Sequence, residues 1–120
     1  MKKILLVDDS VAVVTSWMDL LTKAGYECCS AADGVDGLEA FRAQHPDLII
    51  VDQLMPRMTG LEMIAAVRVE SPKVPIVLLT TISSKEMRAK ATALGVACYG
   101  IKPITQESMM MLVRKLLPNV

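Results

Sequence analysis

The sequence predicts an α/β fold in which five short parallel strands alternate with five amphipathic helices. Short apolar runs recur between longer segments of helical periodicity, and this alternation repeats five times along 120 residues. Right-handed helical crossovers between parallel strands give a doubly wound three-layer sandwich, with a ligand crevice at the carboxyl ends of the strands. The expected strands are residues 3–7, 27–31, 48–51, 76–79 and 97–101.

The first helix is predicted from its apolar spacing. Val14, Trp17, Met18 and Leu21 fall at positions i, i+3, i+4 and i+7, which places them on one core-facing stripe that ends before Gly25. Packing is therefore the expected role of Trp17.

The third and fourth helices carry start and stop signals. Thr59 with Glu62, and Ser83 with Glu86, have the spacing of capping boxes, in which each side chain bonds the other residue's backbone N–H. Gly95 has the position of a residue that closes the fourth helix.

The fifth helix contains Met109, Met110 and Met111 in succession, followed by Leu112. One core-facing stripe cannot bury all four, so some of these side chains are expected to face outward. Two interpretations stay open: methionine as an adaptable core filler, or a methionine-rich docking surface for a partner.

Length and composition indicate one domain, residues 1–120, and disfavour several classes of partner. Thirteen basic and thirteen acidic residues give zero net charge, so nucleic acid and anionic membranes are not expected as partners. The absence of an export signal or a long apolar run favours a cytoplasmic protein. Cys28, Cys29 and Cys98 lack metal-site spacing and are expected to be buried, reduced thiols, with a redox role as the alternative.

Polar residues follow several strands at the edge where the crevice is expected. Carboxylates gathered there repel by roughly 4 kcal/mol per pair at about 4 Å and a dielectric near 20, so they require a cation, most simply a divalent metal. The polar residues of this rim are Asp8, Asp9, Asp52, Thr80, Thr81 and Lys102.

Four motifs occur in order at the ends of these strands. They are Asp8-Asp9, Asp52 with Met55-Pro56-x-Met58-x-Gly60, Thr80, and Tyr99-x-x-Lys102-Pro103. Together they resemble the receiver domain of two-component response regulators over essentially the whole chain. The resemblance implies a flavodoxin-like sheet with strand order 2-1-3-4-5.

The resemblance also implies a metal site and a phosphoacceptor. Asp52 would be phosphorylated by a histidine kinase or phosphotransfer protein. Asp9 would bind Mg²⁺ directly and Asp8 directly or through water, while Asp52 and the backbone carbonyl of Leu54 would complete the protein ligands. Mn²⁺ would be an acceptable substitute.

The same resemblance assigns the remaining motif residues. Lys102 would contact one phosphoryl oxygen and the hydroxyl of Thr80 another, with Lys102-Pro103 forming a cis peptide. Movement of Thr80 would make room for Tyr99, and this pair would remodel the face made by the fourth helix, fifth strand and fifth helix.

Three residues depart from the common family pattern. Thr81 stands where Ala or Gly is usual, which narrows access to the phosphoryl group. Leu54 and Ile82, two residues beyond Asp52 and Thr80, flank the route of an attacking water with apolar side chains. These departures predict a long-lived acyl phosphate.

Single residues distinguish this function from its rivals. A flavodoxin-type electron carrier is excluded because Asp8-Asp9-Ser10 would repel a flavin phosphate. A Mg²⁺-dependent aspartyl phosphatase would place a second Asp where Leu54 stands. A pseudo-receiver that binds partners without phosphorylation, and the phosphatase-like enzyme, stay open as alternatives.

The predicted protein is therefore not an enzyme beyond its own phosphorylation and dephosphorylation. Met1 and the short tail after the last helix favour a stand-alone, chemotaxis-type regulator that docks an unidentified target, with a fragment of a longer chain as the alternative. A monomer is expected, and dimerisation on phosphorylation stays open.

Overall fold

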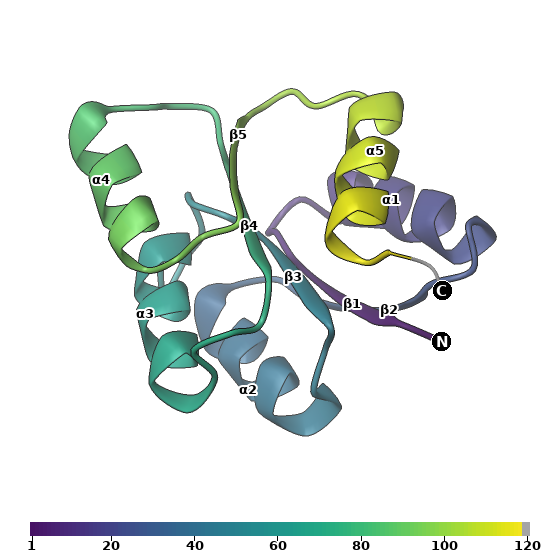
Figure 1. Ribbon diagram of the computed structural model, residues 1–120, viewed down its shortest axis with the longest axis horizontal. Helices are drawn as coiled ribbons and strands as arrows, with labels where there is room; N and C mark the ends of the chain where they lie inside the picture. Colours follow the sequence, from purple (N-terminus) through teal and green to yellow (C-terminus); the bar gives the residue numbers. More distant parts are fainter. Residues whose placement is uncertain (119–120) are drawn as a thin grey trace.

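The computed structural model describes residues 1–118, so residues 119 and 120 of the predicted domain lie outside the described residues. Strands and helices alternate strictly along the chain (Figure 1). The elements are β1 (Lys3–Val7), α1 (Val11–Lys23), β2 (Glu27–Ala31), α2 (Gly34–Gln44), β3 (Leu48–Asp52), α3 (Gly60–Glu70), β4 (Ile76–Thr80), α4 (Lys85–Ala93), β5 (Cys98–Ile101) and α5 (Gln106–Leu116).

The five strands form one parallel sheet in the order β2-β1-β3-β4-β5, which confirms the expected fold class and order. Figure 1 shows α1 and α5 on one face of this sheet and α2, α3 and α4 on the other. Alternate strand residues supply the two core layers: Ile4 packs toward α1 and α5, whereas Leu5 packs toward α2 and α3. Both layers are built almost entirely from aliphatic side chains and methionine.

Burial differs between the central and the edge strands. β3 and β4 are buried along their whole length, as expected for central parallel strands covered on both faces. The edge strands β2 and β5 hold Cys28, Cys29 and Cys98, which are unpaired and only half-buried, so the expectation of full burial was wrong. Burial raises the pKa of the Cys28 and Cys29 thiols, which keeps both in the less reactive protonated form.

Two strands extend one residue further toward the crevice than predicted. β3 ends at Asp52 and β4 at Thr80, and Asp52 lies opposite Leu79 in the sheet register. The next residues continue the pairing, since the N–H of Gln53 donates to Leu79 O at 2.9 Å. Asp52 and Thr80 are therefore fixed by the sheet, although both were expected beyond it.

One predicted capping box is confirmed and the other is wrong. The Thr59 hydroxyl accepts from the Glu62 N–H at 3.2 Å, and the Glu62 carboxylate accepts from the Thr59 N–H at 2.9 Å. At α4 the cap is Ser84, whose hydroxyl accepts from the Met87 N–H at 3.1 Å. Two consecutive serines both suit this position, and the helix begins one residue later than the Ser83 spacing indicated.

Helix α4 is held mainly at its C-terminal end. Ala91 is its only buried residue. The Arg68 guanidinium of α3 donates to Leu94 O at 2.7 Å and Gly95 O at 3.0 Å, just after the helix, and also bonds two carbonyls that follow α3. Gly95 has a φ of 69° and closes the helix as predicted. In its N-terminal half the contacts are weaker: the Arg88 guanidinium lies 5.2 Å from the centre of the Tyr99 ring and donates to the Ser83 hydroxyl at 3.4 Å.

The methionines of α5 separate by exposure. Met109 is fully buried, Met110 and Leu112 are half-buried, and the Met111 side chain is 67% exposed. The expectation that some of them face outward is confirmed. Ile101 at the end of β5 is also 46% exposed, so this face retains apolar side chains.

Candidate functional site

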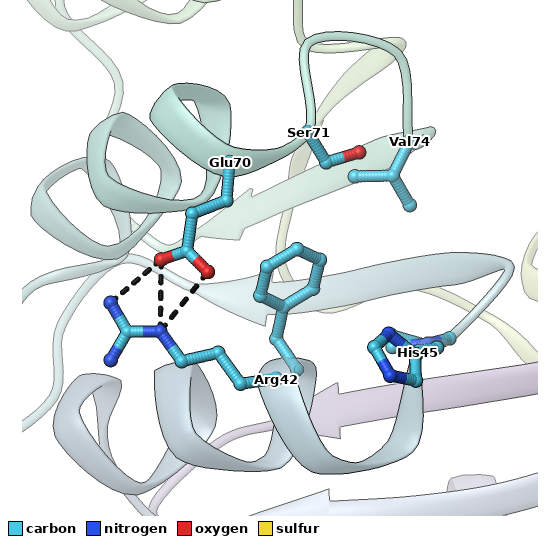
Figure 2. Close-up of a pocket in the computed structure, with 7 residues that line it drawn as sticks. Arg42, His45, Glu70, Ser71 and Val74 are labelled. Atoms are coloured by element: carbon cyan, nitrogen blue, oxygen red, sulfur yellow. Dashed lines mark hydrogen bonds and ion pairs between the residues drawn. The ribbon is translucent and has the colours of Figure 1, made fainter.

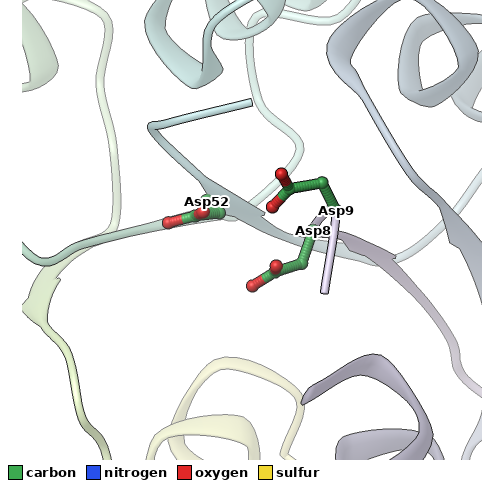
Figure 3. A group of neighbouring side chains, drawn as sticks. All are labelled: Asp8, Asp9 and Asp52. Atoms are coloured by element: carbon green, nitrogen blue, oxygen red, sulfur yellow. The ribbon is translucent and has the colours of Figure 1, made fainter. Parts of the chain in front are cut away.

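Three carboxylates meet at the carboxyl ends of β1 and β3. Each of Asp8, Asp9 and Asp52 offers an oxygen atom, and these atoms lie within 4.8 Å of one another. Figure 3 shows the Asp8 and Asp9 side chains reaching from the end of β1 toward Asp52. Hard carboxylate oxygens at this spacing fit a divalent cation such as Mg²⁺. The structure therefore brings together the three acidic residues that the sequence predicted for the metal site.

The ammonium of Lys102 neutralises part of this acidic cluster. Lys102 Nζ lies 2.9 Å from Asp8 Oδ2 and 3.6 Å from Asp52 Oδ1. The Lys102-Pro103 peptide bond is cis, as predicted. Burial works against the charged form of Lys102, but the hydrogen bond to Asp8 and the charges of Asp8 and Asp52 outweigh it, so the pKa is raised. Lys102 is thus a protonated partner for anionic oxygens.

Asp52 is the most buried of the three carboxylates, with 8% of the residue exposed. Burial raises the pKa of Asp52, and the charges of Asp8 and Asp9 raise it further, while Lys102 acts in the opposite direction. The net pKa is above its ordinary value, because burial, together with the charges of Asp8 and Asp9, outweighs the opposing effects of Lys102 and the Gln53 backbone. An additional cation at the cluster would favour the ionised form of Asp52.

Asp8 and Asp9 differ in their partners. Asp8 Oδ1 accepts from the Ser10 N–H at 2.9 Å and Oδ2 accepts from Lys102, so both oxygens are engaged. Asp9 is exposed, and within residues 1–118 its carboxylate accepts no hydrogen bond from the protein. Of the two, Asp9 has the more available oxygens.

The hydroxyl of Thr80 is buried and points into the β4–α4 loop. It donates to Ile82 O at 2.8 Å and accepts from the Ile82 N–H at 3.1 Å. These are local hydrogen bonds of the kind that Ser and Thr commonly make to nearby backbone. Thr80 must give up its donated bond to Ile82 O before its hydroxyl can donate to a group at Asp52.

Tyr99 carries a buried hydroxyl without a hydrogen-bond partner, the one such side-chain atom among the described residues. The Arg88 guanidinium of α4 lies 5.2 Å from the centre of the Tyr99 ring, a cation–π contact. A buried hydroxyl without a partner costs free energy, so this arrangement of Tyr99 is easily displaced. The Arg88 contact could not be predicted from the sequence, because a helix face that carries lysine and arginine usually faces solvent.

The loop after Asp52 contains a buried amide and an obligatory glycine. Gln53 is 8% exposed, and its Oε1 accepts from the Leu61 N–H at 2.8 Å at the start of α3. A Cβ on Gly60 would lie 2.6 Å from Asp52 O, so any larger residue would push against the end of β3. This contact explains the glycine of the Met-Pro-x-Met-x-Gly motif. Gln53 is a site residue that the sequence analysis missed.

The residues predicted to control access border this site. Leu54 is 51% exposed and Ile82 is 60% exposed, and Thr81 between the strand end and Ile82 is also exposed. Large apolar side chains usually avoid such exposure, so both are notable on the rim of an acidic site.

Two cavities occupy opposite ends of the sheet. A hollow of about 470 Å³ adjoins the acidic cluster and is lined by Asp8 and Asp9 together with residues of α1 and β2. Another, of about 300 Å³, lies between the C-terminal ends of α2 and α3, where the paired Arg42 and Glu70 form one side (Figure 2). The second cavity contains no predicted site residue.

No helix within residues 1–118 is long and apolar enough to cross a membrane.

Comparison with known proteins agrees with this site. The model of the response regulator receiver domain matches residues 4–114. A probable transcriptional regulator, ycf27 of Cyanophora paradoxa, is 34% identical over 97% of this chain and 48% of its own length. The chemotaxis protein CheY of Treponema pallidum is 32% identical over 90% of this chain and 77% of its own length.

Solved structures show the same likeness. The chemotaxis protein CheY4 of Vibrio cholerae superimposes with a TM-score of 0.91 at 37% identity, covering 98% of this chain and 99% of that one. The chain spans about half the length of the two ycf27 relatives and nearly all of CheY4. Because the family match covers almost the whole fold, including all three acidic residues, Lys102 and Thr80, the chain belongs to the response regulator receiver domain family.

Proposed function

We propose that this receiver domain is a phosphorylation-activated switch in which Asp52 takes a phosphoryl group from a histidine kinase or phosphotransfer protein. The observation that carries the proposal is the acidic cluster of Asp8, Asp9 and Asp52 bridged by Lys102. In the transfer, an Asp52 oxygen forms a bond to phosphorus while the bond between phosphorus and the donor histidine nitrogen breaks. The product is an acyl phosphate.

The acidic cluster would hold Mg²⁺, with Mn²⁺ as a substitute. Asp9, Asp52 and the Leu54 backbone carbonyl would bind it directly, and Asp8, whose oxygens are already engaged, would act through water. The bound ion supplies charge that lets anionic nucleophile and anionic phosphoryl group approach. Three carboxylates, one ammonium and one divalent cation then balance in charge.

Lys102 would contact the phosphoryl group once it is bound to Asp52. Its ammonium already lies between Asp8 and Asp52, and a phosphoryl oxygen on Asp52 offers it a third anionic partner at the same place. Because the pKa of Lys102 is raised, it stays protonated throughout. Its role is electrostatic stabilisation of the transferred group.

Phosphorylation would change the face formed by α4, β5 and α5, which a protein target would recognise. The Thr80 hydroxyl would exchange its donated bond to Ile82 O for one to a phosphoryl oxygen, which would shift the β4–α4 loop. The loosely attached N-terminal half of α4 and the unpartnered Tyr99 hydroxyl can then rearrange. A protein target would dock on this altered face. We place these events in the cytoplasm and assign the chain no turnover beyond its own phosphorylation and dephosphorylation.

Acetyl phosphate is expected to add one phosphoryl group to the wild-type protein when Mg²⁺ is present, and none when EDTA replaces Mg²⁺. Both results follow from the need for a cation at the acidic cluster. Intact mass spectrometry measures the gain. An unchanged mass with Mg²⁺ would support a pseudo-receiver instead, and sustained hydrolysis of added phosphomonoesters would support a phosphatase.

Beryllofluoride with Mg²⁺, which mimics an acyl phosphate, is expected to change the Tyr99 ring resonances and the amide signals of α4 and β5. The reason is that Thr80 must leave Ile82 to bond the mimic, so the coupling runs through the β4–α4 loop. Two-dimensional NMR spectra measure the shifts. The amide signals at the C-terminal end of α2, around Arg42 at the opposite end of the sheet, serve as the internal control, and shifts confined to the acidic cluster would exclude the switch.

A further inference from the structure

The loop between β3 and α3 contains an unusual turn. Arg57 has a φ of 70°, and the N–H of Met58 donates to Pro56 O at 2.8 Å, a bond between residues two apart. A positive φ with this bond defines the classic γ-turn, which is rare and strained. Strained backbone of this kind persists only where surrounding contacts fix it. The Arg57 side chain makes two such contacts here.

Arg57 joins the turn to the start of α2. Its Nη1 atom lies 3.1 Å from Asp33 Oδ2 and 3.5 Å from Asp36 Oδ1. The Asp33 carboxylate is only 9% exposed, and its other oxygen caps α2 by accepting from the Asp36 N–H at 2.8 Å. An ion pair to a buried, hydrogen-bonded carboxylate is more strongly held than a surface pair. The start of α2 is therefore a fixed anchor.

The backbone approach at this junction leaves little freedom. A Cβ on Gly34, the first residue of α2, would lie 2.6 Å from both Cβ and O of Met58. The loop thus rests directly against the helix start, immediately after Arg57. Asp36 also lines the hollow that contains Asp8 and Asp9, so this ion cluster borders the acidic site.

We infer that Arg57 is a positioning residue for the cation site: its ion pairs with Asp33 and Asp36 hold the γ-turn and so fix the loop that carries the Leu54 carbonyl. The inference rests on the proposed function, in which that carbonyl binds Mg²⁺. The loop is tied at its start by the Gln53 N–H to Leu79 O and at its end by the Gly60 N–H to Gln53 O. Arg57 supplies the side-chain tie between these ends.

Two possible roles of Arg57 predict opposite changes in Mg²⁺ affinity when its side chain is replaced: a role through its charge alone, and a role in positioning the loop. Loss of a positive charge beside an acidic cluster strengthens cation binding by simple electrostatics. Loss of a tie that orients a ligand weakens cation binding, typically by 10-fold or more for residues that support metal ligands. The sign of the change in Mg²⁺ affinity therefore separates the two roles.

Arg57→Asn is the decisive variant, because Asn tolerates a positive φ and removes the charge without adding backbone strain. Calorimetric titration with MgCl₂ is expected to give a dissociation constant about 10-fold above that of the wild type. Arg57→Lys is expected to recover most of the affinity, since a single Arg57 nitrogen makes both ion pairs. Amide exchange at Met58 is expected to speed up in the Asn variant alone.

Arg42→Gln is the matched control, because Arg42 forms another arginine–carboxylate pair between α2 and α3, at the opposite end of the sheet (Figure 2). Its Mg²⁺ affinity is expected to equal that of the wild type. Unchanged or tighter binding by Arg57→Asn, or an equal loss in Arg42→Gln, would overturn the inference while leaving the proposed function intact. A wild-type protein that binds no Mg²⁺ would overturn both.

Discussion

Asp52→Asn is expected to gain no mass from acetyl phosphate and Mg²⁺, and to be more stable than the wild type when Mg²⁺ is absent. The first effect follows because the amide oxygen of Asn is a poor nucleophile and cannot form the acyl phosphate. The second follows from the excess of negative charge at the cluster. A residue required for function would thus lower the stability of the fold.

The expected size of the stabilisation follows from the distances in the site. Repulsion between unit charges at 4.8 Å, the spacing limit of the cluster, is about 3.5 kcal/mol at an effective dielectric near 20. Asp52 meets two such neighbours, and the attraction of Lys102 at 3.6 Å offsets about 4.6 kcal/mol of it. Part of the repulsion that is left is relieved by relaxation of the site. We therefore expect Asp52→Asn to raise the free energy of unfolding by roughly 1–2 kcal/mol.

The stabilisation should depend on pH in one direction. The pKa of Asp52 is raised in the folded protein, so ionisation at neutral pH costs stability that the Asn variant does not lose. Below the pKa of an unfolded aspartate, about 3.9, the carboxyl is neutral in both states and the difference disappears. The advantage of the variant should therefore shrink as the pH falls through the raised pKa.

Urea denaturation with EDTA, at neutral and acidic pH, measures this difference. Asp19→Asn is the control, since Asp19 is an exposed carboxylate of α1 paired with Lys23 four residues along the helix. Its effect on the free energy of unfolding should stay within about 0.5 kcal/mol, with normal phosphorylation. An Asp52→Asn variant that still gains a phosphoryl group, or that is less stable than the wild type at neutral pH, would contradict the electrostatic account.

The central features of the fold were predictable because each depends on local sequence or on a general rule of topology. Continuous apolar runs marked β1, β3 and β4, and the carboxyl ends of parallel strands had to share one edge. The sequence alone therefore predicted that Asp8, Asp9 and Asp52 lie together, and the resemblance to receiver domains implied their roles. The roles of Thr80, Tyr99, Leu54, Thr81 and Ile82 remain predictions.

The features that could not be predicted depend on side chains distant in sequence. Arg57 and Asp33 are separated by 24 residues, and a surface arginine in a loop carries no signal of its partner. The same holds for the bonds of Arg68 to carbonyls after α4, 26 and 27 residues away. The misplaced cap at Ser83 has a local cause, since adjacent serines compete for one position and only the path of the backbone selects between them.

The double variant Leu54→Asn, Ile82→Glu is expected to shorten the lifetime of the acyl phosphate by roughly 10-fold to 100-fold. Hydrolysis requires a water molecule aligned opposite the bond between phosphorus and Asp52. Leu54 and Ile82, which the resemblance to receiver domains places beside this route, are apolar and about half exposed, so they would exclude water without orienting it. An amide and a carboxylate at these positions offer hydrogen bonds that hold the attacking water in line.

Loss of apolar bulk and gain of a polar group can each shorten the lifetime of the acyl phosphate, and single variants separate the two effects. Leu54→Ala removes apolar bulk without adding a polar group, so it should shorten the lifetime less than Leu54→Asn if alignment of water matters more than access. Thr81 stays in place in all variants and keeps its contribution to access constant. Because Leu54 and Ile82 are exposed, the substitutions should leave the free energy of unfolding within about 0.5 kcal/mol of the wild type.

The decay of phosphorylated protein, after removal of acetyl phosphate and followed by intact mass, measures these lifetimes. Val69→Asn is the matched control: Val69 is 86% exposed on α3 and outside the site, so the same loss of exposed apolar surface should leave the lifetime unchanged. A wild-type acyl phosphate that decays as fast as that of the double variant would show that the two apolar residues do not restrain hydrolysis. Water access would then be set by Lys102 and the bound cation, which both forms share.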